Sequence, residues 1–210
     1  MSGQAQSLEK YTYGDYLTWD EGDRWEIIEG RAYDMSPAPA TAHQHVSAAL
    51  TAQLFTHFSD KPCNVFAAPF DVRLPLSDEA DEDIETVVQP DIVMVCDPHK
   101  LDERGCRGAP DWIIEILSPS TAAKDMITKK ALFEKHGVRE YWLVHPIDRI
   151  VTALLLGDSG TFGEAKVSEA RHTQQVEIFP DIHIDWDRVF ASLPGTLSIK
   201  EGKPPPYGRR

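Results

Sequence analysis

The chain has 210 residues, of which 41% are hydrophobic and 26% charged, which suits one domain with its own core and excludes a disordered or collagen-like protein. Its 34 acidic and 21 basic residues give a formal charge of −13. That charge argues against a general polyanion-binding protein, because non-specific DNA affinity comes from lysine and arginine side chains that neutralise phosphates. The charge is uneven, however: residues 77–85 include six acids and no base, whereas residues 124–139 include five bases.

One domain is predicted over residues 10–198, between a flexible N-terminal tail (1–9) and a proline-rich C-terminal tail (199–210). In chain order, apolar periodicity and turn residues first predict a hairpin over 24–36 that turns at Glu29 and Gly30, and then a helix from His43 to Phe58. A strand over 64–76, interrupted at Pro69, is predicted to pair with a strand over 86–97, with a solvated acidic loop over 77–85 between them. After a loop over 100–110 come a buried strand over 111–118, a helix that runs to His136 and stops at Gly137, two strands over 139–146 and 149–157, and a final strand and short helix within 175–190. This order predicts a mixed α/β fold with a central mixed sheet and a helix on each face.

The three cysteines, Cys63, Cys96 and Cys106, are widely spaced and form no CxxC pair, so they indicate neither a zinc site nor a redox motif. Cys96 lies in an apolar run and is predicted to be a small core residue. The N-terminus lacks a basic segment followed by an apolar stretch, and no run approaches the roughly 20 apolar residues that span a bilayer. We expect a soluble cytoplasmic protein that does not bind membranes.

Two predicted strands each carry one acid inside an apolar run, namely Asp91 in "QPD" and Glu115 in "IIEILS". Because burial of an unpaired carboxylate is costly, such an acid needs a cationic partner or a metal ion. Taken singly, each acid has a simpler explanation. Asp91 begins its strand after Pro90 and is then merely exposed, or Glu115 pairs with a nearby lysine or arginine.

The helix that follows Glu115 carries Lys124, Lys129 and Lys130, close enough to reach back over the end of the strand. Two carboxylates and a lysine are the groups that metal-assisted phosphodiester hydrolysis requires. The carboxylates hold a hard cation such as Mg²⁺, the cation polarises the phosphate and lowers the pKa of the attacking water, and the lysine stabilises charge or orients that water.

Over residues 10–157 the chain resembles the Uma-type family of bacterial restriction endonucleases, within the PD-(D/E)xK nuclease superfamily. The resemblance is carried by "RWEIIEGRAYDMSP", "HQHV", "APFDVRL", "QPDIVMV" and "APDWIIEILSPSTAAKDMITKKALFEKHGVREYWLVHP". It implies a restriction-endonuclease-like core that cuts DNA, with the N-terminal hairpin and the C-terminal strands as additions to that core.

Carried over to this chain, the resemblance implies that Asp91 and Glu115 bind Mg²⁺, or Mn²⁺ in its place. The backbone carbonyl of Ile116 is then a further metal ligand, and Lys129 is the catalytic lysine. Lys130 is the competing lysine, because on a helical wheel it projects closer to the apolar face, whereas Lys129 lies at the edge of that face.

The chain departs from the family pattern at three positions. Leu117 stands two residues after Glu115, where the plain superfamily pattern has its lysine, so the resemblance implies that the lysine role moved to the following helix. Phe133 replaces a family tyrosine, and Arg31 replaces a family acid. The two polar contacts of that tyrosine and that acid are therefore absent here, whereas the metal ligands are kept.

Three more residues match polar positions of the family and are candidates for auxiliary roles. Glu26 is a candidate metal or water ligand, or else an exposed strand acid. His43 is a candidate phosphate contact, and Asp71 is either catalytic or part of a structural salt bridge.

Other metal sites are excluded by spacing. His43 and His45 form an HxH pair, but two residues apart at a helix start they point about 200° apart and would not share a zinc ion. The acidic residues 77–85 lack the D-x-D-x-D-G spacing of an EF-hand Ca²⁺ loop.

The leading hypothesis is a Mg²⁺-dependent DNA endonuclease that acts as a homodimer, because enzymes that cut both strands often use two sites related by a two-fold axis. The competing hypothesis is an inactive nuclease-like scaffold that binds nucleic acid or a protein partner. The catalytic hypothesis requires Asp91 and Glu115 on one face of the sheet, with their carboxylates within roughly 5 Å.

Overall fold

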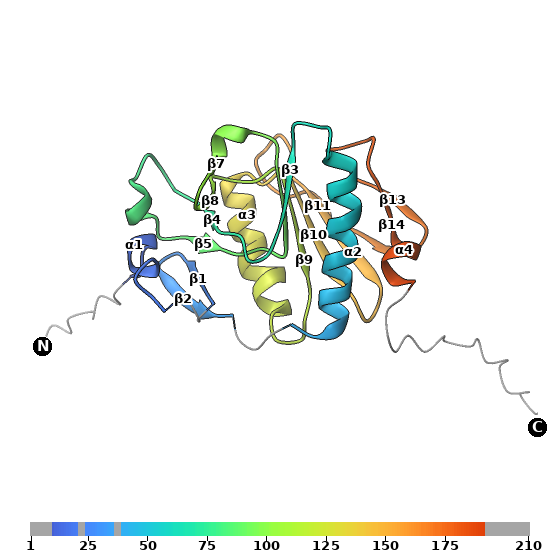
Figure 1. Cartoon of the computed structure of the whole chain (residues 1–210), viewed down its shortest axis with the longest axis horizontal. Helices are drawn as coiled ribbons and strands as arrows, with labels where there is room; N and C mark the ends of the chain where they lie inside the picture. The colour runs from blue at the N-terminus through green and yellow to red at the C-terminus, as the bar shows by residue number, and fades with distance from the viewer. Residues whose placement is uncertain (1–9, 21–23, 36–38, 192–210) are drawn as a thin grey trace, which may run out of the picture.

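The computed structural model describes residues 10–20, 24–35 and 39–191 (Figure 1). The predicted tails, 1–9 and 199–210, and the last part of the predicted domain, 192–198, lie outside the described residues. The predicted limits of the domain therefore stay predictions. No helix in the described ranges is long and apolar enough to cross a membrane.

In the described part of the chain, the central sheet has six strands in the order β12-β11-β10-β9-β6-β3. Their bounds are β3 (Asn64–Ala67), β6 (Ile92–Val95), β9 (Trp112–Ile116), β10 (Glu140–His145), β11 (Ile150–Leu155) and β12 (Lys166–Glu169). β9 and β10 are parallel, and the other neighbours are antiparallel. Because parallel neighbours need a crossover connection, a helical segment joins them, the π-helix η3 (Lys124–Lys129) continued by α3 (Lys130–His136).

A second six-stranded sheet of the described residues has the order β2-β1-β5-β4-β8-β7. Its strands are β1 (Trp25–Ile28), β2 (Arg31–Asp34), β4 (Val72–Arg73), β5 (Val87–Val88), β7 (Leu101–Asp102) and β8 (Gly105–Arg107), and a separate pair is formed by β13 (Thr173–Gln175) and β14 (His183–Asp185). The mixed α/β class, the N-terminal hairpin and the C-terminal strands are confirmed.

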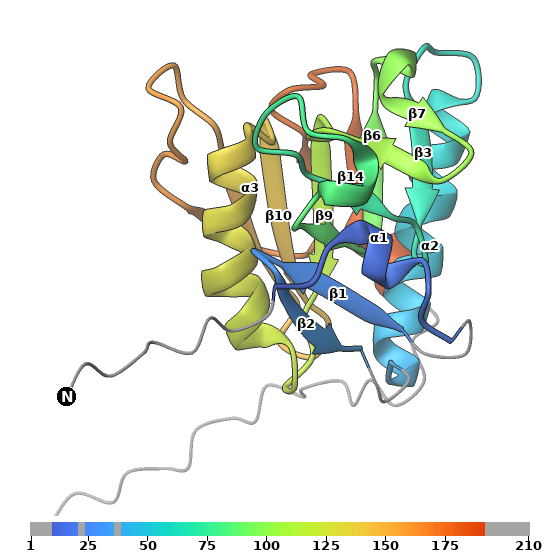
Figure 2. The same cartoon turned by 90° about the vertical axis from the view of Figure 1, so that its left-hand side faces the viewer.

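Helices cover both faces of the central sheet (Figures 1 and 2). The remaining helices are α1 (Tyr13–Tyr16), α2 (Thr41–Phe58) and α4 (Trp186–Phe190). α2 and α4 pack on one face, against a core that includes Ile114 and Ile116 of β9. α3 and the second sheet pack on the other face, against a core that includes Ile113 and Leu117. Successive residues of β9 thus alternate between two buried faces, which explains its continuous apolar sequence.

The crossover helix stops where the sequence predicts. Gly137 adopts the left-handed conformation with φ of 84°, and its N–H donates to the carbonyl of Glu134. Glycine is favoured at this position because it has no Cβ to clash. The π-helical first part of the segment, η3, was not expected from the spacing of its apolar residues.

The predicted strands 64–76 and 86–97 do pair, but each one divides between the two sheets. β3 pairs with β6 in the central sheet, and β4 pairs with β5 in the second sheet. The breaks lie at Pro69, which follows a cis peptide bond, and at Pro90. Proline has no N–H to contribute to a ladder, so both strands end there.

Residues 100–110 are not a plain loop, because they contain the β7–β8 hairpin. Gly105 closes this hairpin with φ of +121°, and a Cβ there would lie 2.2 Å from the Asp71 carbonyl oxygen. β12 and β13 likewise have no counterpart among the predicted elements. These strands are short and lack a clear alternation of apolar residues, which leaves little for a sequence pattern to detect.

The acidic residues 77–85 are more than a solvated loop. They include a 3₁₀ turn, Asp81–Asp83. Asp81 accepts hydrogen bonds from Arg73 and Arg107, and the fully buried Arg73 also pairs with Asp102 at 2.6 Å. Part of this acidic charge therefore neutralises arginines of the second sheet.

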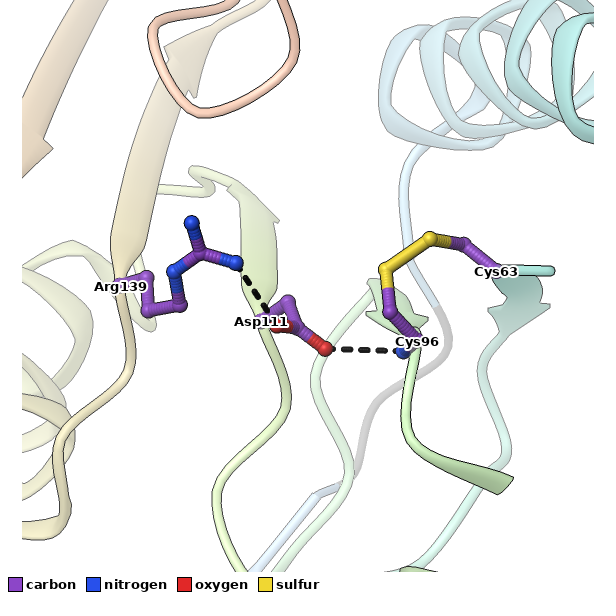
Figure 3. Close-up of a disulfide and its surroundings, with 4 residues drawn as sticks. All are labelled: Cys63, Cys96, Asp111 and Arg139. Carbon is purple, nitrogen blue, oxygen red and sulfur yellow. Dashed lines mark hydrogen bonds and ion pairs between the residues drawn. A yellow bond between two sulfur atoms is a disulfide. The ribbon is translucent and has the colours of Figure 1, made fainter. Parts of the chain in front are cut away.

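Cys96 is not a free core thiol, because it forms a disulfide with Cys63 (Figure 3). The two cysteines extend the β3–β6 ladder one step beyond the pair Asn64 and Val95, so they lie directly opposite each other. The backbone N–H of Cys96 also donates to Asp111 at 2.8 Å, as Figure 3 shows. The pairing depends on strand register, which cysteine spacing alone does not reveal.

Candidate active site

Asp91 and Glu115 lie on the same face of the central sheet. β6 and β9 are antiparallel with Ile92 opposite Ile114, so the next step of this register places Asp91 opposite Glu115. The neighbours two residues along on each strand belong to the core beneath α3. Both acids therefore point to the side of the crossover helix, as the catalytic hypothesis requires.

Each of the two acids is held by the strand that carries the other. Asp91 Oδ2 accepts a hydrogen bond from the N–H of Ile116 at 2.7 Å, and Glu115 Oε2 accepts a longer one from the N–H of Asp91 at 3.3 Å. Asp91 is half-buried and Glu115 is buried. The backbone of each strand thus orients the carboxylate that the other strand carries.

Lys129 reaches this pair from η3. Its Nζ lies 2.7 Å from Glu115 Oε1, 2.6 Å from Glu26 Oε1 and 3.7 Å from Asp125 Oδ1. The residue is only 2% exposed. The carboxylates and the predicted lysine therefore form one buried cluster.

Lys130, the competing lysine, lies outside the cluster and pairs with Glu134 at 3.9 Å. The π-helical geometry explains why a helical wheel misplaces the two lysines. In a π-helix hydrogen bonds join residues i and i+5, so residues five apart lie on one face. Lys124 and Lys129 are five apart and both bind Glu26, whereas in an α-helix they would point about 140° apart.

Glu26 is a central acid of the cluster rather than an exposed strand acid. It is fully buried in β1, and its Oε2 accepts a hydrogen bond from Lys124 at 2.8 Å. Its Oε1 accepts from the backbone N–H of Gln89 at 3.0 Å, in addition to the contact with Lys129. Both oxygens are engaged by protein donors.

Burial and the two lysines shift the pKa values of the acids in opposite directions. Burial raises the pKa of Glu26, but Lys129 and Lys124 outweigh it and lower the value to about 2. Burial raises the pKa of Glu115 well above its usual range, and Lys129 opposes this while the neighbouring acids add to it. Both acids are similarly close to Lys129, so the difference comes from Lys124, which lowers the pKa of Glu26, and from the neighbouring acids, which raise that of Glu115. A further cation beside Glu115 would favour its ionised form.

The two histidines of α2 serve different partners, as their spacing predicts. His43 Nε2 lies 3.0 Å from Asp91 Oδ2, whereas His45 Nε2 lies 3.1 Å from the carbonyl oxygen of Val189. His43 therefore contacts a carboxylate of the cluster. Its predicted contact with phosphate stays a prediction.

Asp71 does not contact the carboxylate cluster, and among the described residues its hydrogen-bond donors are neutral. Its Oδ1 accepts from Gln89 Nε2 at 2.9 Å and from the Tyr16 hydroxyl at 3.2 Å. Burial raises the pKa of Asp71, and these hydrogen bonds oppose the shift. In the described part of the chain, neither the salt bridge nor a contact with the carboxylate cluster is found for Asp71, so both alternatives stay predictions.

A cavity of about 570 Å³ lies over the cluster. Besides Asp91, Glu115 and Lys129, the cavity is lined by polar and charged side chains, among them Arg24, His43, Gln44, Ser47, Gln89, Ser118, Ser120, Thr121, Lys124 and Thr128. Hydroxyl, amide and cationic groups are the ones that contact nucleic-acid backbones. A larger cavity, of about 1340 Å³, borders β1 and β2 and contains neither Asp91 nor Glu115.

The donor set fits a divalent cation of the Mg²⁺ type. Asp91 and Glu115 supply carboxylate oxygens. The N–H of Ile116 points toward Asp91 on β6, and in an antiparallel pair the carbonyl of the same residue points to the same neighbouring strand. Pro90 on that strand has no N–H to donate to this carbonyl, which leaves its oxygen available to a cation. Mg²⁺ usually takes one or two carboxylates and completes its shell with water and phosphate oxygens. No three His, Cys, Asp or Glu side chains of the described chain are placed to hold one ion together, so Asp91 and Glu115 would be its two carboxylate ligands.

The charge of the cluster also fits a cation. Glu26, Asp91, Glu115 and Asp125 supply four carboxylates, whereas Lys124 and Lys129 supply two positive charges. Arg24 also lines the cavity and adds a third positive charge, so carboxylates outnumber cationic side chains by one when all four acids are ionised.

Residues 13–187 match the model of the Uma2 family, which is described as "Putative restriction endonuclease". The chain belongs to the Uma2 family. The predicted family resemblance is therefore confirmed, and membership supports a nuclease-like function for the cluster.

Two relatives of this Uma2 protein are informative. A crystal structure of a putative nuclease belonging to DUF820, from Anabaena variabilis, superimposes with a TM-score of 0.67 and 21% identity, over 86% of this chain and 97% of that one. At that identity the likeness shows the fold. An uncharacterized protein of Synechocystis sp. is 24% identical over 132 residues, which are 62% of this chain and 65% of the relative's length. This Uma2 protein thus matches less than two thirds of that relative.

The sequence of this Uma2 protein points to no role for Arg24 or Gln89 and places Lys124 near Glu115 without naming its partner; all three line the cavity. The one available signal was Glu26, an acid inside the apolar run "WEII", which implied an unidentified cationic partner. That partner lies 98 residues further along the chain.

Proposed function

We propose that this Uma2 protein is a divalent-metal-dependent DNA endonuclease. The observation that carries the proposal is the pairing of Asp91 and Glu115 across β6 and β9, with the buried Lys129 bonded to Glu115. The description of the family as restriction endonucleases supports DNA as the substrate and the phosphodiester as the bond that is cut.

Asp91, Glu115 and the carbonyl of Ile116 would hold the cation. When bound, Mg²⁺, or Mn²⁺ in its place, supplies polarisation of the phosphate and a lowered pKa of the attacking water. Lys129 contributes the positive charge nearest to Glu115, where it stabilises charge that develops on the phosphate or orients the water. Glu26 positions this lysine, and His43 holds Asp91 from the side of α2.

The formal charge of −13 is compatible with this proposal because charge is unevenly placed. Arg24, Lys124 and Lys129 line the cavity, whereas Asp81, in the acidic segment, is bound to buried or half-buried arginines. As proposed from the sequence, the protein acts in the cytoplasm as a homodimer, which would place two sites on the two strands of a duplex.

Cleavage of supercoiled plasmid in Mg²⁺, in Mn²⁺ and in EDTA tests the proposal. We expect nicked and linear products with either metal and none in EDTA. Glu115→Ala and Asp91→Ala should each lower the rate by about 100-fold or more, since loss of an interaction that supports a metal typically costs 10–100-fold and a direct ligand matters more. Lys130→Ala, outside the cluster, is the matched control. Cleavage that survives Glu115→Ala would exclude the assignment.

The competing candidate is a nuclease-like scaffold that binds nucleic acid or a protein partner without cutting. Leu117, in place of the superfamily's lysine, and the net charge favour it. Calorimetric titration with Mg²⁺ and Mn²⁺ separates the two, because the scaffold needs no metal at Asp91 and Glu115.

A further inference from the structure

Arg24 is a cation of the cavity whose hydrogen-bonding capacity is largely unused. It lies directly before β1, is half-buried, and lines the cavity together with Asp91 and Glu115. Its Nη2 donates to Oε1 of Gln89 at 3.3 Å, and its Nε is buried without a hydrogen-bond partner among the described residues. A guanidinium is always charged and carries five N–H donors. One long bond to a neutral amide leaves most of those donors without a protein partner among the described residues.

The lysines of the same cavity differ from Arg24. Lys124 is paired with Glu26, and Lys129 with both Glu26 and Glu115. Arg24, in contrast, forms no ion pair with any acid of the described chain. A partly desolvated cation with no counter-ion among the described residues favours an anion in the cavity that approaches it.

Gln89 is fixed in the orientation that Arg24 requires. Its Nε2 donates to Asp71 Oδ1 at 2.9 Å and to the Tyr16 hydroxyl at 3.0 Å, which leaves Oε1 to face Arg24. Its backbone N–H donates to Glu26. Asp71 therefore acts on the cavity through Gln89, although it does not contact the carboxylate cluster.

We infer that Arg24 binds a backbone phosphate of the nucleic-acid substrate, and that Gln89, Asp71 and Tyr16 are its positioning residues. The inference rests on the proposed nuclease function for the identity of the substrate. The chemical class follows from the guanidinium itself, whose planar fork donates two parallel hydrogen bonds to a phosphate. This contact would supply binding at a point separate from the metal ligands.

The test is binding of a short fluorescent DNA duplex, measured by anisotropy in EDTA over a range of salt concentrations. Arg24→Ala should weaken binding by about 10-fold and lower the slope of log K against log salt by about 0.9, as expected for one lost phosphate contact. Arg31→Ala, an exposed arginine on the same hairpin, is the matched control and should leave the slope unchanged. Arg24→Lys should recover part of the affinity, because lysine restores the charge without the fork.

Asp71→Asn tests the positioning chain. An amide at position 71 can donate a hydrogen bond to Gln89, which allows the side-chain amide of Gln89 to flip by 180°. The flipped amide then presents an N–H to Arg24 instead of an oxygen. We expect weaker DNA binding with an unchanged salt slope, and thermal unfolding of each variant checks that it is folded. In Mg²⁺, Arg24→Ala should raise KM with little change in kcat, as for an interaction made equally in the ground and transition states.

The outcomes separate this inference from the proposed function. A wild-type protein that binds DNA through Arg24 but does not cut it overturns the nuclease and leaves the phosphate contact standing. A protein that cuts DNA, with Arg24→Ala and Arg31→Ala equal in affinity and salt slope, overturns the phosphate contact alone. If the wild-type protein does not bind the duplex at all, the inferred phosphate contact of Arg24 is also overturned.

Discussion

Lys129 Nζ lies 2.7 Å from Glu115 Oε1, and both residues are less than 5% exposed. Away from water the attraction between the two charges is strong, and either charge would be costly to bury without the other. The link between the crossover helix and β9 therefore concerns stability as well as chemistry.

Lys129→Met should lower the free energy of unfolding by about 3–5 kcal/mol, the usual cost of leaving one partner of a buried pair uncompensated. Lys130→Ala should change it by at most about 1 kcal/mol, since that side chain is half-buried and its one ion pair, with Glu134, is long. Urea denaturation measures both. The double variant Lys129→Met with Glu115→Gln should regain stability without regaining cleavage. Equal stability of the Lys129→Met and Lys130→Ala variants would contradict the paired arrangement.

Glu26 should make stability depend on acid pH. Its pKa is lowered to about 2 from an ordinary value of 4.5, so its ion pairs stabilise the fold above pH 4.5 and are lost as the pH falls toward 2. The shift corresponds to about 3 kcal/mol. Urea denaturation at several pH values should show wild-type protein losing more stability over this range than Glu26→Gln does. Parallel curves for the two proteins would show that Glu26 is not held ionised by the lysines.

Divalent metal should stabilise the folded protein through Asp91 and Glu115. A ligand at 100 times its Kd contributes about 2.7 kcal/mol, so Mg²⁺ or Mn²⁺ should raise the Tm of the wild type, and EDTA should reverse the rise. Asp91→Asn should abolish the effect. Asp71→Asn changes an acid outside the cluster and should retain it. A similar rise in the Asp91→Asn variant would place the metal elsewhere.

Reduction of the disulfide should destabilise the protein without affecting the site. Cys63 and Cys96 are 33 residues apart, and closing a loop of that length contributes about 3–4 kcal/mol in the chain-entropy treatment. Dithiothreitol or Cys63→Ser should lower the urea midpoint accordingly. Cleavage by the folded protein should be unchanged, because Cys96 lies at the end of β6 opposite to Asp91.

Disulfides are rare in reducing cytoplasm. Thiol trapping in intact cells therefore checks the expected location of the protein. We expect Cys63 and Cys96 to be recovered as free thiols if the protein is cytoplasmic, whereas a fully oxidised pair would contradict that location.

The sequence by itself was sufficient to predict features whose signal lies within a single helix or strand. The apolar spacing from His43 to Phe58 predicts α2, and Gly137 predicts the end of α3, because both signals are local. Asp91 and Glu115 are recognisable for a similar reason, since a carboxylate inside an apolar strand is visible from its neighbours alone. Lys129 depended on the family resemblance, because the π-helical turn moves it away from its position on an ordinary helical wheel.

Only the tertiary structure decided which side chains meet. Lys124 reaches Glu26 across 98 residues, and Arg24 reaches Gln89 across 65. The disulfide and the division of two strands between two sheets are decided in the same way. Periodicity determines which face of its own element a side chain occupies, but its partner depends on the register and packing of elements far apart in the chain. That is why two acids could be singled out from the sequence, whereas the lysines and the arginine around them acquired partners only in the folded protein.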